Sequence, residues 1–112
     1  MDTLSQDQDA VERVLCEAAR FYDLPADPVR TVPVFDRSHD QYLLVREGWR
    51  GFERVHHAWV HVELREGKFW VQEDGTQEGV ATDLIALGVP KERIVLAFQH
   101  PSRRKYGEFA PV

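Results

Sequence analysis

Residues 54–74 read RVHHAWVHVELREGKFWVQED, and this stretch decides the fold. Two runs that are rich in β-branched and aromatic residues flank the pair Glu66-Gly67. Glycine accepts the positive φ that a two-residue hairpin turn requires. The pattern therefore predicts an antiparallel hairpin in which Arg65 lies opposite Lys68.

The two faces of the predicted hairpin differ, because successive side chains of a strand point to opposite sides. Pairing outward from the turn places Glu63 opposite Trp70, His61 opposite Gln72 and Trp59 opposite Asp74. One face is aliphatic and is expected to pack against helices; it holds Ala58, Val60, Val62, Leu64, Phe69 and Val71. The other face is aromatic and polar, and with the preceding strand it is expected to hold Tyr42, Leu44, Arg46, His57, Trp59, His61, Glu63, Trp70, Gln72 and Asp74.

Three uses are open for this aromatic face. Another segment of the chain can cover it, as in any layered domain. It can be a protein–protein interface, where Trp, Tyr and Arg are enriched; the residues of such a site would be Tyr42, His57, Trp59, His61 and Trp70. It can also stack nucleic-acid bases, although the net charge of −5 disfavours this use.

Hydrophobic periodicity predicts the other elements. A first helix carries an apolar stripe from Val11 to Tyr22, with Asp7 or Asp9 as its cap and Pro25 limiting its end. Strands are predicted at 31–36, 41–49, 54–65, 68–74 and 94–98, a second helix at 77–87, and a polar tail from residue 100. The fold class is α+β in a single domain, 1–112: an N-terminal helix, a four-stranded antiparallel meander, a second helix and a short fifth strand.

The junction before the second helix is acidic. Glu73, Asp74 and Glu78 are carboxylates of the kind that bind divalent cations or transfer protons. Their spacing matches no calcium loop, and a structural interpretation is preferred: Asp74-Gly75 forms a turn and Thr76 caps the helix. At the other end, Gly88 suits a helix C′ position and Pro90 follows it, as is typical of a helix end. The residues predicted to have structural roles at the two ends of this helix are therefore Asp74, Thr76, Gly88 and Pro90.

Composition narrows the function classes. The chain has 112 residues, a net charge of −5 and one cysteine, Cys16, so it has no internal disulfide framework. No motif predicts catalytic residues, a metal site or a cofactor. His57 and His61 lie about 13 Å apart along the strand, too far to share a metal ion without another element. The acidic, polar N-terminus and the absence of a long apolar run predict a cytoplasmic protein without a membrane segment.

Arg103, Arg104 and Lys105 form the one basic run. Such a run can contact phosphate or an acidic partner. It can equally be a solvated tail that balances part of the acidic surface, and this interpretation is preferred on three charges alone.

Several segments together resemble the XisI family of small bacterial fdxN-element excision-controlling factor proteins. The resemblance rests on Gly48-Trp49 and on residues 54–56, 61–72, 74–81 and 87–98. It covers nearly the whole chain. This sequence departs from the family pattern at His57, where Gly is usual, at Glu63, where Asp is usual, and near the C-terminus.

The resemblance implies a non-catalytic accessory or regulatory factor of programmed DNA-element excision. A separate recombinase would perform the strand chemistry, and the factor would act through protein contacts with that recombinase or with a nuclease-like partner of the XisH type. Self-association is a further expectation. The alternatives are a direct DNA-binding module using Arg103, Arg104 and Lys105, or an antitoxin-like inhibitor of a linked nuclease.

Overall fold

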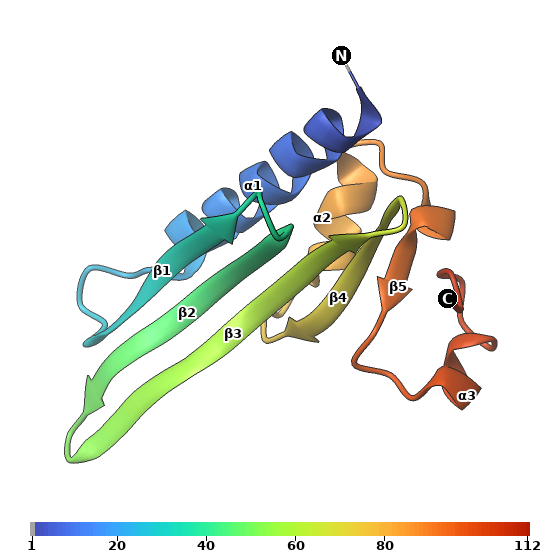
Figure 1. Ribbon diagram of the computed structural model, residues 1–112. Helices are drawn as coiled ribbons and strands as arrows, with labels where there is room; N and C mark the ends of the chain where they lie inside the picture. The colour runs from blue at the N-terminus through green and yellow to red at the C-terminus, as the bar shows by residue number, and fades with distance from the viewer. Residues whose placement is uncertain (1) are drawn as a thin grey trace.

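The computed structural model describes residues 2–112 and places two helices on one side of a twisted five-stranded sheet (Figure 1). The strands are β1 (Val29–Asp36), β2 (Gln41–Arg50), β3 (Glu53–Arg65), β4 (Lys68–Asp74) and β5 (Ile94–Leu96), and they lie side by side in chain order. The first four pair antiparallel, and β5 pairs parallel to β4. The predicted α+β architecture is confirmed, and the parallel β5 adds to it.

Helix α1 (Thr3–Tyr22) begins earlier than its apolar stripe indicates. Asp2 is its N-cap, and the carboxylate accepts a hydrogen bond from the Ser5 backbone N–H at 2.7 Å. The predicted caps were therefore wrong. Asp7 instead lies buried within the helix and forms an ion pair with Arg93, just before β5. This ion pair connects the N-terminal helix to the C-terminal part of the sheet.

The hairpin turn has the predicted geometry. Glu66 and Gly67 both have positive φ, 53° and 75°, as expected for the turn type that matches the twist of hairpin strands. Arg65 pairs with Lys68 as predicted, and the predicted register holds as far as the pair of Val62 with Val71.

Beyond that pair the register shifts, and here the prediction was wrong. A bulge in β4 pairs His61 with Glu73 and Val60 with Asp74. A second bulge, in β3, leaves Trp59 without a partner between Val60 and Ala58. Each extra residue reverses which side of the sheet the following side chains face. The aliphatic face is therefore confirmed for its other members, whereas Ala58 pairs with Val45 on the opposite side.

Helix α2 (Val80–Ala86) begins three residues later than predicted. Thr76 is not its N-cap, because Gly79 occupies that position with φ 94°. Asp74 instead accepts hydrogen bonds from the Thr76 backbone N–H at 3.0 Å and from the Val80 N–H at 2.7 Å. The acidic turn thus organises the approach to the helix.

The end of α2 follows the prediction. Gly88 has φ 98°, and its N–H donates to the Ile85 carbonyl at 2.9 Å. The next N–H, that of Val89, reaches back to the Leu84 carbonyl at 3.1 Å, which completes a glycine-terminated helix end. Pro90 then precedes the 3-10 turn η1 (Lys91–Arg93), which leads into β5.

The main core lies between the sheet and the two helices. Val11, Val14 and Leu15 of α1 and Leu84 of α2 pack on the strand residues that point to this side. The strand members of the core are Tyr42, Leu44, Val60, Val62, Leu64, Phe69, Val71 and Ile94. Within residues 2–112, no helix is both long enough and apolar enough to cross a membrane.

The C-terminal segment is structured rather than an extended tail. It contains the short helix α3 (Pro101–Arg104) and then turns back along β5, where the Ala110 N–H donates to the Ile94 carbonyl at 2.9 Å. Phe109 packs against the main core, whereas Ala110 joins Trp70 and Val95 on the other side of the sheet. The segment therefore wraps around the β5 edge.

Candidate partner-binding surface

The predicted aromatic face does not exist as one surface. Tyr42 belongs to the main core with no exposed area, and its hydroxyl donates to Asp40 at 3.1 Å. Burial and this carboxylate raise the pKa of the Tyr42 phenol well above its usual range. Tyr42 is therefore a core residue and is not available to a partner.

Trp59 also lies on the helix side, because the β3 bulge turns it there. Its ring packs edge-on against Tyr22 of α1, with ring centroids 5.1 Å apart, and the Arg46 guanidinium lies 4.9 Å from its centroid. Arg46 is held in turn by Asp27, at 3.2 Å. Trp59 thus joins α1 to β2 and β3, and it does not share a surface with Trp70.

Trp70 lies on the opposite side of the sheet and is only 8% exposed. Ala110 and Val95 pack beside it, its indole N–H donates to the Arg65 carbonyl at 3.1 Å, and the Arg65 guanidinium lies 3.9 Å from the ring centroid. Trp70 is therefore covered by another segment of the chain, which is the first of the three uses considered for the aromatic face.

The two strand histidines have different environments. His57 is exposed near the end of the sheet, where it pairs with Arg46 across the strands. His61 is half-buried, with its Nε2 2.6 Å from the side-chain oxygen of Gln41. Among residues 2–112, no group of three or more His, Cys, Asp or Glu side chains is placed to hold a metal ion.

The acidic junction is a crowded surface cluster. Burial raises the pKa of Asp83, and the negative charges of Glu78, Asp74 and Glu17 raise it further. Glu17, Glu78 and Asp83 line a shallow hollow beside Phe21. The carboxylates repel one another there, while Asp74 itself is engaged by backbone donors of its own turn.

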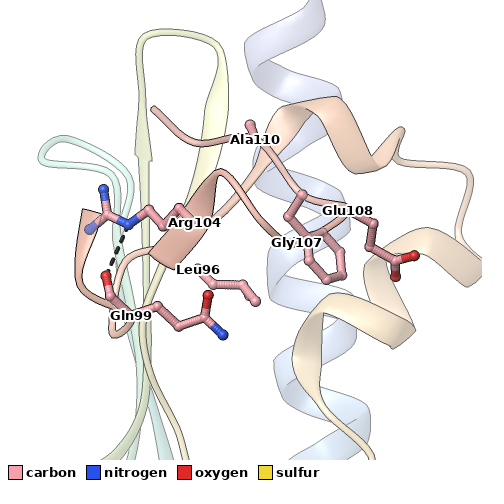
Figure 2. A pocket seen from close by; sticks show the side chains of 7 residues that line it. Leu96, Gln99, Arg104, Gly107, Glu108 and Ala110 are labelled. Atoms are coloured by element: carbon pink, nitrogen blue, oxygen red, sulfur yellow. Dashed lines mark hydrogen bonds between the residues drawn. The ribbon is translucent and has the colours of Figure 1, made fainter. Parts of the chain in front are cut away.

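The basic run is divided by its structural roles. Arg104 donates to the backbone carbonyl of Gln99 at 3.0 Å (Figure 2). It also donates to the carbonyl of Ala97 at 3.2 Å. A third, longer bond reaches Pro111 at 3.4 Å. Arg104 therefore holds the C-terminal segment in place, whereas Arg103 and Lys105 are exposed.

A small pocket lies beside Arg104, between Leu96 of β5 and the C-terminal segment at Gly107 and Glu108 (Figure 2). Its volume of about 190 Å³ is below the roughly 300 Å³ at which cofactor and small-molecule sites begin. The pocket is therefore a packing gap under the segment.

The sheet also has an uncovered face. Within residues 2–112, no helix covers the side of β1, β2 and β3 that points away from α1 and α2 (Figure 1). The register places an apolar patch at its centre. This patch, called the outer face below, consists of Val32 and Val34 of β1, Leu43 and Val45 of β2 and Ala58 of β3.

The β2–β3 hairpin also projects beyond the rest of the sheet (Figure 1). The pairing of β1 with β2 stops at Gly48, and that of β4 with β3 stops at Val60. In the part of the chain that the structure describes, residues 49–54 therefore have no neighbouring strand outside the hairpin. This segment is called the arm. It carries Phe52, which is fully exposed, and Trp49, which is 54% exposed and lies 5.5 Å from the Arg54 guanidinium.

Comparison with known proteins identifies the chain. The family model described as XisI protein matches residues 1–111. The chain belongs to the XisI family. Its fold also matches a XisI-like protein from Anabaena variabilis ATCC 29413, with a TM-score of 0.87 and 30% identity over 96% of this chain and 97% of that one.

A second solved structure of the XisI family is equally similar. It is the fdxN element excision controlling factor XisI from Anabaena variabilis ATCC 29413, with a TM-score of 0.86 and 30% identity over 99% of this chain and 100% of that one. The comparison with curated proteins found no match.

Sequence reasoning missed the arm and the outer face of this XisI protein. A signal for the outer face was present, since Leu43 and Val45 alternate with the core residues Tyr42 and Leu44. Val32 and Val34 likewise share one side of the preceding strand. Phe52 stands between the strands predicted at 41–49 and 54–65, in a connection where a large apolar residue has no structural reason to be. The β3 residues of the outer face could not be predicted without knowing where the bulges lie.

Proposed function

We propose that this XisI protein is a non-catalytic accessory factor of programmed DNA-element excision that works by binding a partner protein. The partner would be a recombination or nuclease-like protein of the XisH type. The observation that carries the proposal is the arm, where a fully exposed phenylalanine stands on a hairpin that no other strand supports.

The physical argument rests on the cost of leaving Phe52 in water. Burying a phenylalanine side chain gains about 1.5–3 kcal/mol, and this chain forgoes that gain in the folded state. The same arm carries Trp49, whose ring lies 5.5 Å from the Arg54 guanidinium, and tryptophan and arginine are enriched among the residues that dominate binding energy at protein interfaces. A projecting hairpin can enter a concave partner without rearrangement of the sheet that supports it.

The net charge of −5 supports a protein partner over a nucleic-acid one. Binding to nucleic acid depends mainly on neutralising phosphates, which requires a basic surface. Arg104, in the centre of the basic run, already spends its donors on carbonyls of its own chain. A contact protein also needs no reacting group.

Calorimetric titration of this protein with its XisH-type partner tests the proposal. Phe52→Ser should weaken binding by about tenfold or more, because truncating an interface anchor costs at least 1–2 kcal/mol. Phe21→Ser is the matched control, since Phe21 is 71% exposed on α1, away from the arm. Equal affinity of the wild type and Phe52→Ser, or equal losses in the two variants, would overturn the assignment of the arm.

A further inference from the structure

The outer face is apolar at its centre and charged at its two ends. Across the strands, Val32, Val45 and Ala58 form its middle row, because Val45 pairs with the other two. These side chains are only half-buried, by one another and not by a covering element. An apolar sheet face of this kind is normally one half of a sandwich of two sheets.

The two ends of the outer face carry opposite charge. At the end toward the arm, Arg30 and Arg54 both bond the single carboxylate of Glu47, which leaves one positive charge in excess. At the other end, Asp36 and Glu63 flank Gln41 across the strands. Arg65 lies 3.4 Å from Glu63, and His39, which counts as neutral in the formal charge, lies 2.7 Å from Asp36. This end has one negative charge in excess.

We propose that a second copy of this chain covers the outer face, with the strands of the two copies antiparallel. Two sheets can pack face to face about a twofold axis that runs either along the strands or across them. An axis along the strands places each charged end on the same end of the other copy. An axis across the strands places the basic end of one copy on the acidic end of the other, and the apolar middle row on itself.

Charge complementarity therefore selects the axis across the strands. Packed sheets cross at about 30°, so the contact is between the two ends as groups of long side chains, not between fixed pairs. The interface is self-complementary, as a twofold dimer requires. Arg54, at the base of the arm, belongs to this interface, whereas Phe52 lies in the turn beyond it and remains exposed, so this inference does not depend on the proposed function.

The sheet edges offer no alternative contact of similar quality. Pro33 lies in the edge strand β1 and has no N–H, which removes one donor from that edge. At the other edge, the C-terminal segment already bonds β5 through Ala110. Self-association is thus directed to the face of the sheet.

Sedimentation equilibrium of the full chain tests the dimer. The wild type should show a molecular mass twice the 13.0 kDa of one chain. Arg54→Glu alone and Glu63→Arg alone should each raise the dissociation constant about tenfold or more, because each places like charges together at both ends of the interface. Circular dichroism confirms that both variants remain folded.

Mixing the two variants supplies the decisive control. Positions 54 and 63 lie nine residues apart along β3, about 30 Å at the usual rise per residue, so they do not interact within one chain. In a mixed dimer each end faces its opposite charge again, and an equimolar mixture should recover the dimer. A monomeric wild type, a dimer that neither substitution weakens, or a mixture that stays monomeric would each overturn the proposal.

Discussion

The indole ring of Trp59 occupies the space in which a side chain at position 75 would lie. A Cβ added to Gly75 would stand 2.2 Å from both Cδ1 and Nε1 of the ring. The Gly75 N–H also donates to the Trp59 carbonyl at 2.9 Å. The β3 bulge and the turn before α2 are therefore one unit, in which a glycine is needed for close approach and not for a positive φ.

Gly75→Ala should lower the free energy of unfolding by about 1–3 kcal/mol, the usual cost of forcing extra atoms into a packed site. Urea denaturation measures the effect. Gly107→Ala is the matched control and should be nearly silent, since the nearest heavy atom to its added Cβ is 3.7 Å away. A Gly75→Ala protein as stable as the wild type would show that Trp59 is free to move off the turn.

At the scale of single elements, the hairpin could be predicted near its turn and not beyond it. Glu66-Gly67 fixes the register locally, and the first four pairs follow by counting. A bulge adds one residue with no marker in an unbroken run of β-forming side chains, so the count fails at Trp59 and Gln72. The aromatic face predicted by counting pairs from the turn therefore combined residues of the core with residues on the outer side of the sheet.

The C-terminal segment was hidden for a different reason. Residues 100–112 are polar and lack periodicity, which is typical of a loose tail. The segment is fixed by Arg104, which bonds the carbonyls of Ala97 and Gln99, seven and five residues earlier in the chain, and these bonds need the fold-back that the chain makes here. The sequence offered Arg104 as part of a basic run, and nothing in its neighbours distinguishes it from Arg103.

Arg104→Gln should release this segment from the β5 edge and uncover Trp70. We expect faster cleavage of the last ten or so residues by a protease and a loss of about 1.5–3 kcal/mol in the free energy of unfolding, as for hydrogen bonds of charged groups. Arg103→Gln removes the same charge from an exposed position and should change neither. If both variants behave alike, the hydrogen bonds of Arg104 have no role in stability.

At the scale of the whole molecule, the helices cover one side of the sheet and leave the other side of β1–β3 open (Figure 1). The family of the chain, its α+β class and most element positions could be predicted from the sequence. The arm and the outer face could not, because exposure is a property of what lies beside a residue in space. The net charge of −5 is unevenly distributed over the molecule. The excess positive charge at one end of the outer face and the excess negative charge at the other end favour a second copy as the partner of this face.

We propose that this XisI protein acts by contact through its arm. Hydrogen–deuterium exchange of the full chain, with and without its XisH-type partner, tests this proposal most directly. The partner should slow exchange at residues 49–54 and leave residues 101–105 unchanged. Protection of the basic run or of α1, with the arm exchanging as fast as in the free protein, would contradict it.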